Sequence, residues 1–186
     1  MSILAMTANA AKVGANKAQV TTVKWSKPEV RQVKVNVDAS FYADSCTGAI
    51  GAVIRDVKGD FIAASTNYIP HVASAMVAEA LAMKEGIGLA HRMGCSRVVA
   101  ESDSLEVIQA CNGEQRWWNE ASAIFADCVD AAINLDSISF THCPRESNEV
   151  AHSLARFCFD AKSDCTWVDE PPSFLLQPLL DDVTIL

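Results

Sequence analysis

The stretch KVNVDASF, residues 34–41, decides the fold, because it joins a strand pattern to an acidic side chain. Val33, Val35 and Val37 occupy alternate positions, which is the period of a strand with one buried face. Asp38 follows on the opposite face, where an ionised side chain beside an apolar run is costly unless it is paired or binds a metal. A solvated acid at the end of a strand is the alternative interpretation.

Two further apolar runs follow this strand at residues 49–54 and 61–69. The polar stretches 43–48 and 56–60 separate the three runs and are typical of turns. Three short strands joined by tight turns predict an antiparallel meander.

The second half of the chain alternates helix and strand patterns. Apolar residues three and four apart predict a helix over residues 74–93, with Ser74 as its cap. The remaining predicted elements are strands at 97–100 and 138–140 and helices at 104–111, about 119–135 and 148–161. Such alternation implies right-handed crossovers and parallel neighbours, so we predict an α/β fold with a mixed sheet.

We divide the chain into a loose N-terminal arm (residues 1–30), one domain (31–165) and an acidic C-terminal tail (166–186). The apolar residues 174–176 and 179–180 in the tail are expected to dock on the domain or on a partner. None of the apolar runs approaches the ~20 residues of a membrane span.

Composition bears on partners and on compartment. The formal charge is −8, so contact with a phosphate backbone would depend on a local basic patch or on bound cations. The seven cysteines are odd in number and lack C-x-x-C spacing, which argues against a zinc ribbon or a disulfide framework. Reduced thiols favour an intracellular location, nuclear or cytoplasmic, with an organelle left open.

Two more acidic residues and two histidines are candidates for a functional site. Glu79 lies among small apolar residues of the first helix, and its alternative is an ordinary exposed helix acid. Asp103 follows the strand at 97–100, and its alternative is a helix cap. His142, placed in a loop after a strand, has the chemistry of a proton shuttle, whereas His152 lies on a helix face. Gathered with Asp38, these residues would form an oxygen-rich site for a divalent metal, suited to cutting a phosphodiester.

Several of these stretches together resemble the type 1 ribonuclease H domain, in the plant branch related to retroelement reverse transcriptases. The resemblance covers about residues 25–180, with its motifs in the family's order and spacing. Its carriers are residues 34–41, 78–82, 101–104, 142–148 and 151–155.

The resemblance implies a five-stranded mixed sheet with helices on both faces. It also implies cleavage of the RNA strand of RNA–DNA hybrids by two magnesium ions. Asp38 would then bridge both ions, Glu79 and Asp103 would hold one each, and His142 would assist water delivery or product release.

The same resemblance assigns nucleic-acid contacts to Asn148, Arg145 and Arg116. Arg116 lies where well-known members carry a lysine-rich protrusion, and it stands here with two tryptophans only. At the fourth metal position, where the family usually has aspartate, this chain has His152. Imidazole is a poor magnesium ligand, so His152 would weaken the second metal, shift the preference to manganese, or abolish turnover.

Three hypotheses follow. The first is a metal-dependent endonuclease acting on RNA–DNA hybrids, as a monomer. The second is a catalytically impaired ribonuclease H-like domain that binds nucleic acid. The third is a protein-interaction module that uses the C-terminal tail.

Overall fold

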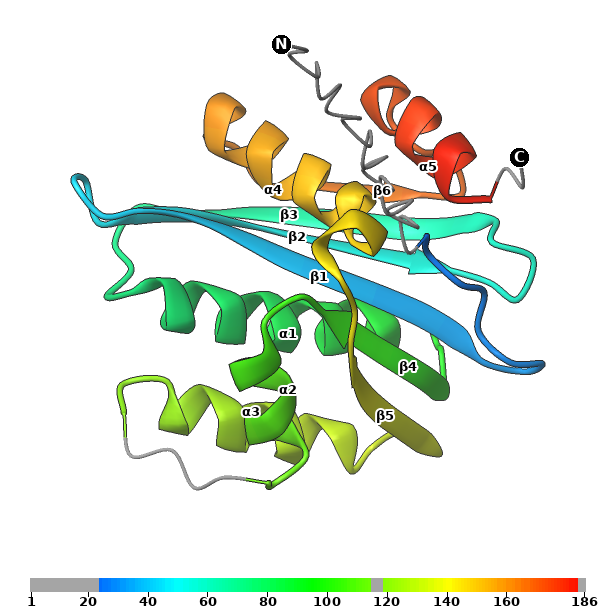
Figure 1. The fold of residues 1–186 in the computed structure, drawn as a ribbon, viewed down its shortest axis with the longest axis horizontal. Coiled ribbons are helices and arrows are strands. Elements are labelled where there is room, and N and C mark those ends of the chain that lie inside the picture. Colours follow the sequence, from blue (N-terminus) through cyan, green and yellow to red (C-terminus); the bar gives the residue numbers. More distant parts are fainter. Residues whose placement is uncertain (1–23, 115–118, 184–186) are drawn as a thin grey trace, which may run out of the picture.

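The computed structural model describes residues 24–114 and 119–183, which form one mixed sheet covered by helices on both faces (Figure 1). The strand order across the sheet is β5-β4-β1-β2-β3-β6. The strands are β1 (Val33–Tyr42), β2 (Thr47–Arg55), β3 (Phe61–Ile69), β4 (Arg97–Ser102), β5 (Ser137–His142) and β6 (Cys165–Val168). The first three strands are antiparallel neighbours, whereas β1, β4 and β5 run parallel, so the predicted mixed sheet and meander are confirmed.

The sheet has six strands in the described part of the chain, not the five that were expected. The additional strand, β6, pairs antiparallel with β3, with Thr66 opposite Cys165 and Ala63 opposite Val168. A four-residue strand is too short to show a clear alternation in the sequence. It forms because β3 would otherwise leave an unpaired edge.

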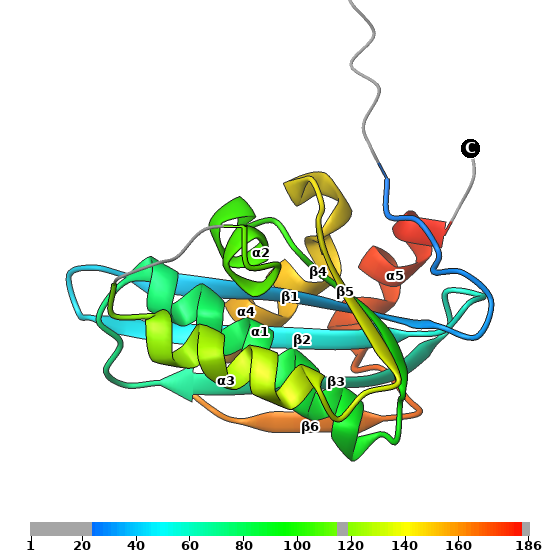
Figure 2. The ribbon, with the colours of Figure 1, turned by 90° about the horizontal axis from the view of Figure 1, so that it is seen from below.

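Helices cover the two faces of the sheet unequally. The longer helices are α1 (Ala75–Arg92), α2 (Leu105–Cys111), α3 (Ser122–Ala132), α4 (Glu149–Ala161) and α5 (Leu176–Val183), with short 3-10 turns η1 (Arg145–Ser147) and η2 (Ser173–Leu175). The main core lies where α1 and α3 pack on one side, and Figure 2 shows both helices there. A smaller core joins α4 to the opposite face and includes Val53, Leu154 and Leu175.

Local signals explain where α1 begins. The Ser74 side chain accepts a hydrogen bond from the Val77 backbone N–H at 3.3 Å, as expected of a helix cap. None of the helices in the described ranges has the length and apolar character that a membrane span requires.

Both ends of the described chain meet on a buried arginine of β2. The guanidinium of Arg55 lies 3.6 Å from the Trp25 ring centroid, and its Nη1 is 2.6 Å from Asp182 Oδ2. Arg55 Nη2 and Trp25 Nε1 both donate to Asn36 Oδ1, at 3.0 and 2.8 Å. We call these four residues the Arg55 network. Through it, residues on each side of the domain are held against the same face of the sheet.

Candidate metal centre

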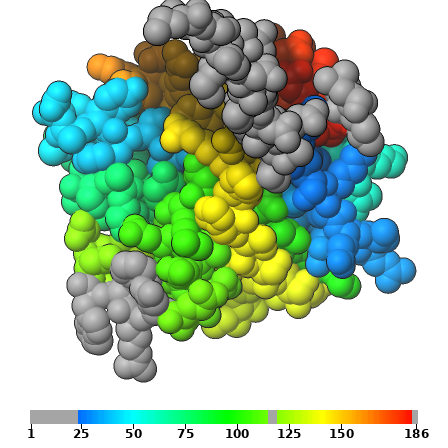
Figure 3. All heavy atoms as spheres, viewed as in Figure 1, coloured from blue at the N-terminus to red at the C-terminus, as the bar shows by residue number. Residues whose placement is uncertain are grey.

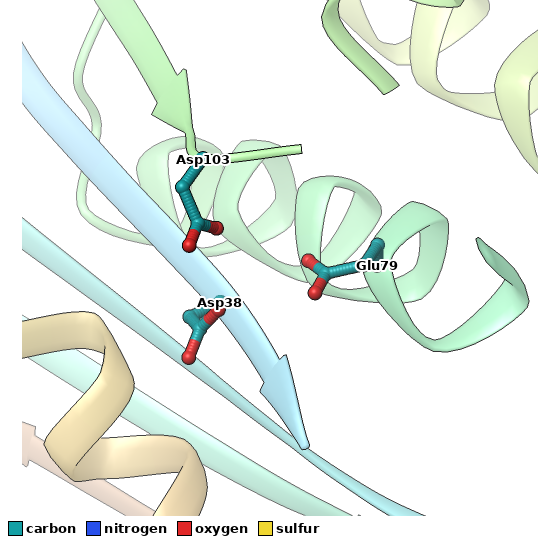
Figure 4. A group of neighbouring side chains, drawn as sticks. All are labelled: Asp38, Glu79 and Asp103. Carbon is teal, nitrogen blue, oxygen red and sulfur yellow. The ribbon is translucent and has the colours of Figure 1, made fainter. Parts of the chain in front are cut away.

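Three carboxylates from distant parts of the chain meet beside β1. Asp38 lies within β1, Glu79 in the second turn of α1 and Asp103 directly after β4. One ligand oxygen from each lies within 4.8 Å of the others. Figure 4 shows the three side chains together between the strands and the helix. The structure therefore brings together the three acids that the sequence singled out.

Close packing of α1 on β1 puts Glu79 in this position. A Cβ atom at Gly86 would lie 2.5 Å from Val37 Cγ1 and 3.0 Å from Val35 Cγ1, so only glycine permits the contact. Glu79 is seven residues earlier on the helix, and residues at that spacing share a face. The face of α1 that touches the valines therefore also carries Glu79 toward Asp38.

Parallel pairing puts Asp103 beside Asp38. Val37 of β1 is opposite Ser102 of β4, so the next residues of both strands are neighbours. The Ser102 hydroxyl accepts from the Ser104 backbone N–H at 3.1 Å, which holds the turn after β4. Ser104 occupies the N-cap position of α2, and among the described residues no side chain caps that helix. The alternative role of Asp103 as a cap is therefore not what the structure shows.

Burial and the neighbouring acidic charges make ionisation of Asp38 and Glu79 unfavourable. Burial, with a further contribution from the Asp103 charge, raises the pKa of Asp38 to about 6, although the hydrogen bond to His152 works in the opposite direction. Burial likewise raises the pKa of Glu79 well above its usual value, and the charges of Asp38 and Asp103 add to the effect. A cation bound among the three groups would reverse this penalty.

The chemistry of the donor set fits a hard divalent cation. Glu79 Oε2 is a buried atom without a hydrogen-bond partner in the described structure. An unpartnered buried carboxylate oxygen is costly, and Mg²⁺ favours such oxygens. Asp38, Glu79 and Asp103 are thus the residues able to hold a metal here.

His152 contacts this cluster through Asp38. Its Nδ1 lies 2.8 Å from Asp38 Oδ2. The approach depends on Gly51, the residue opposite Asp38 in the β1–β2 register. A Cβ atom at Gly51 would lie 2.5 Å from Leu154 Cβ and 2.7 Å from the Ala151 carbonyl oxygen. The bare backbone of β2 at this point lets α4 sit close enough for His152 to reach Asp38.

The other sequence-predicted residues line one side of the centre or lie apart from it. His142 is the last residue of β5, not in the loop after a strand, because β5 continues parallel to β4 as far as Ser102. Its Nε2 is 3.2 Å from the Asp103 carbonyl oxygen, and the ring is exposed. Arg145 is exposed in η1, and its positive charge partly offsets the rise in the pKa of Glu79.

Asn148 has a structural contact next to the centre. Its side-chain nitrogen donates to the Val37 carbonyl at 2.9 Å, and its backbone carbonyl accepts from the His152 N–H at 3.0 Å. Asn148 is buried, so it joins β1 to the start of α4.

Arg116 lies outside the described residues. In Figure 3 the yellow segment linking β5 to α4 runs exposed beside the green residues of α2.

A polar pair behind the metal centre was missed from the sequence. Asn36 and Glu101 stand two residues before Asp38 and Asp103 on the same strands, and Asn36 Nδ2 donates to Glu101 Oε2 at 3.0 Å. Lys34 Nζ lies 2.7 Å from Glu101 Oε1. Asn36 alternates with Asp38 on one face of β1, and that was the available signal. The pair fixes β1 against β4 just behind Asp38 and Asp103.

Comparison with known proteins places this arrangement in a family. A family model described as Reverse transcriptase-like matches residues 36–158. The chain therefore belongs to the reverse transcriptase-like family, whose matched region includes the three carboxylates, His142 and His152. A comparison with curated protein sequences gives no match.

Solved structures of ribonuclease H domains share the fold. The N-terminal ribonuclease H domain of a Mycobacterium tuberculosis protein, solved as a maltose binding protein fusion, is 21% identical, with a TM-score of 0.66 over 70% of this chain and 94% of that one. The ribonuclease H1 of Halobacterium salinarum is 23% identical, with a TM-score of 0.65 over 70% and 98%. LC11-RNase H1, solved in complex with an RNA/DNA hybrid, is 22% identical, with a TM-score of 0.64 over 70% and 98%. The fold is ribonuclease H-like.

Proposed function

We propose that this protein is a metal-dependent endonuclease that cleaves the RNA strand of RNA–DNA hybrids. The observation that carries the proposal is the meeting of Asp38, Glu79 and Asp103 within 4.8 Å of one another on a ribonuclease H-like sheet. Two of the three acids, Asp38 and Glu79, have raised pKa values, and Glu79 has an unpartnered oxygen, so a divalent cation would stabilise the site.

The three carboxylates would hold Mg²⁺ or Mn²⁺, with Asp38 shared between two ions and Glu79 and Asp103 each holding one. Ions held there would supply a nucleophilic water at neutral pH and would neutralise charge in the transition state. The protein's own task is to fix the carboxylates before substrate arrives. The Asn148 bond to Val37 and the Asn36–Glu101 pair do this at the two residues of β1 that precede Asp38.

His152 replaces a fourth carboxylate and acts through Asp38. When Nδ1 carries the hydrogen, it donates to Asp38 Oδ2, and Nε2 is left as the acceptor of the ring. A neutral nitrogen donor suits manganese better than magnesium. We therefore infer that the site prefers Mn²⁺.

Two exposed residues at the rim would serve the substrate. His142 lies against the Asp103 backbone and can move a proton at Nε2 during water delivery or product release. Arg145 is exposed near Glu79 and would contact a phosphate of the bound strand. With a net charge of −8, such local cations and the metal ions would carry most of the phosphate contact.

The fold and one comparison support a hybrid as the substrate. LC11-RNase H1, which shares the fold, was solved with an RNA/DNA hybrid. Recognition of such a duplex depends on its shape and on 2′-hydroxyls more than on base sequence. A sequence-independent substrate also agrees with a site built from carboxylates and not from base-reading side chains.

The test is cleavage of an end-labelled RNA–DNA hybrid by the pure protein with Mg²⁺ or Mn²⁺. Cleavage is expected when a divalent cation is present, and it should be faster with Mn²⁺ than with Mg²⁺. The Asp38→Asn variant should not cleave the hybrid. Double-stranded DNA of the same sequence is the substrate control. Absence of cleavage with both metals would contradict the proposal.

One contact favours a second function, nucleic-acid binding without turnover. The His152 hydrogen bond engages Asp38 Oδ2, and in the described part of the chain no fourth carboxylate belongs to the cluster. A domain of that kind would bind the hybrid in the presence of metal and leave it intact. A gel-shift assay together with the cleavage assay separates the two functions.

The C-terminal tail gives a reason to test a protein partner. Leu176 and Leu180 lie four residues apart on α5, and their side chains are 50% and 56% exposed. Exposed apolar residues on one helix face are a feature of interaction sites. Substituting both by Ser should remove any partner captured with the full chain, and unchanged capture would exclude α5.

A further inference from the structure

Three aromatic side chains gather at the hairpin end of β1, away from the metal centre. The rings of Tyr42 and Phe159 are stacked, with centroids 3.7 Å apart and an interplanar angle of 17°. Tyr68 approaches Phe159 at 6.3 Å in a tilted arrangement. We call Tyr42, Phe159 and Tyr68 the aromatic patch. Tyr42 is 46% exposed although Phe159 covers one face of its ring, so part of the residue is presented to solvent.

Two of the three elements of the aromatic patch, β1 and α4, also carry Asp38 and His152. Tyr42 follows Asp38 by four residues and therefore lies on the same face of β1. Phe159 follows His152 by seven residues and lies on the same side of α4. Figure 1 shows α4 running across the sheet toward the end of the β1–β2 hairpin. Seven helical residues span about 10 Å, roughly the axial length of three stacked nucleotides.

A positively charged side chain lies between the aromatic patch and the metal centre. Arg156 is four residues after His152 and three before Phe159, so it shares their side of α4. It is exposed, and its guanidinium can contact a phosphate. Asp160 and Lys162 at the end of the helix are both exposed and of opposite sign. Stacking of a base on an aromatic ring does not depend on the sign of these neighbouring charges.

We propose that the aromatic patch binds an unpaired nucleotide of the RNA strand, one that continues the strand held at Asp38 beyond the end of the hybrid. This rests on the proposed function, since Asp38 defines which strand passes over α4. Within a duplex both faces of every base are covered, so a protein ring stacks on a base that has left the pairing. Tyr42 supplies the ring, Phe159 supports it from behind, and Arg156 holds a phosphate on the way.

The proposal predicts a preference for hybrids that carry a single-stranded RNA tail. Kd is measured by fluorescence anisotropy with the full chain in Ca²⁺, for a blunt hybrid and for hybrids with a four-nucleotide RNA tail at the 5′ or the 3′ end. One tail polarity is expected to lower Kd about tenfold, the size of one stacked base. A DNA tail on the opposite strand should give no gain. Equal Kd for blunt and tailed hybrids would overturn the proposal.

Variants of Tyr42 separate stacking from a general effect on the fold. Tyr42→Leu keeps the bulk and loses the ring, so the tail advantage should disappear while Kd for the blunt hybrid is unchanged. Tyr42→Phe keeps the ring and should keep the advantage. Arg156→Gln should reduce the salt dependence of tail binding by about 0.7 in the logarithmic slope. A tail advantage that persists in Tyr42→Leu would overturn the role of the ring.

The inference and the proposed function fail in different ways. A hybrid that is cleaved equally with and without the tail leaves the nuclease intact and removes the aromatic patch from the substrate path. A single-stranded RNA with 2-aminopurine that is quenched by the native chain and not by Tyr42→Leu, without any cleavage of hybrids, supports the patch and removes the nuclease. Absence of binding to every probe overturns both.

Discussion

The imidazole of His152 shares a hydrogen bond with the carboxylate of Asp38, at 2.8 Å between Nδ1 and Oδ2. This contact links the last long helix of the domain to the central strand of the metal centre. In the proposed nuclease the ring would take the place of a fourth carboxylate, and the first prediction tests that exchange.

His152→Asp should raise Mg²⁺-dependent cleavage of a hybrid by at least about tenfold, a magnitude typical of changes to residues that orient metal ligands. The new carboxylate supplies a hard oxygen donor where imidazole is a poor one. Single-turnover rates in Mg²⁺ and in Mn²⁺ measure the effect. His152→Asn is the matched control, since it keeps a polar side chain without charge and should give no gain. A decrease in both metals for His152→Asp would show that the native imidazole is itself required.

The stability of the metal-free protein should fall as pH rises through about 6. The folded state binds the Asp38 proton more tightly than the unfolded chain, whose pKa is near 3.8. The stabilisation from this proton is complete below the unfolded pKa and is lost as pH rises through the folded pKa, a change of about 3 kcal/mol. Urea unfolding at pH 4 and pH 7 in EDTA measures it.

Two comparisons isolate Asp38 in that measurement. Asp38→Asn should show a smaller difference between pH 4 and pH 7, because an amide does not titrate. Saturating Mg²⁺ at pH 7 should recover stability in the native chain and not in the variant. An identical pH profile for the two proteins would mean that Asp38 does not ionise in this range.

Gly51→Ala should separate His152 from Asp38 and destabilise the fold. The new methyl group would overlap the backbone and side chains of α4, at 2.5 Å from Leu154 Cβ, so the helix must move outward. An overpacked core site of this kind costs about 1–3 kcal/mol. Thermal melts measure the loss, and the cleavage rate should fall together with it.

Gly88→Ala is the control for that substitution. Gly88 lies in α1, and a Cβ atom there would meet only the flexible end of Arg92, at 3.3 Å. Alanine is a better helix former than glycine, so Gly88→Ala should stabilise by up to about 1 kcal/mol. Equal effects from both substitutions would argue that Gly51 has no special closeness to α4.

Asp182→Ala should cost about 3–5 kcal/mol, because it leaves the Arg55 charge buried without its partner. The side chains of Arg55 and Asp182 are only 1% and 7% exposed. Adding Arg55→Met to Asp182→Ala should recover most of the loss. Asp181→Ala, at an exposed neighbour, is the control and should change stability by less than about 0.5 kcal/mol. Chemical denaturation distinguishes the four proteins.

The sequence predicted the elements that have a period of their own. The alternating valines of β1 and the spaced apolar residues of α1 are found where expected, with boundaries shifted by one or two residues. Asp38, Glu79 and Asp103 lie on or beside such elements, and their meeting was a hypothesis based on their chemistry and on the resemblance. Their catalytic role stays a prediction.

The features that the sequence did not predict depend on contacts between residues that are far apart in the sequence. β6 has four residues and exists because β3 offers an edge. The sequence left open whether the apolar tail docks on the domain or on a partner, and Leu175 is fully buried in the smaller core. Arg55 reads as an ordinary charge before a turn, and only the fold brings Trp25 and Asp182 to it. The contact between His152 and Asp38 likewise needed the glycine on the neighbouring strand.

The Arg55 network bears on how the connectivity of the polypeptide can be changed. Trp25 and Asp182 contact the same guanidinium, so residues 24 and 183, at the two ends of the described chain, lie near each other. A short linker between them would make a circular permutant, with new ends opened in the exposed turn at residues 43–46. In such a protein the strand that carries Asp38 would be severed from the one beside it, yet every buried contact behind the metal centre would survive.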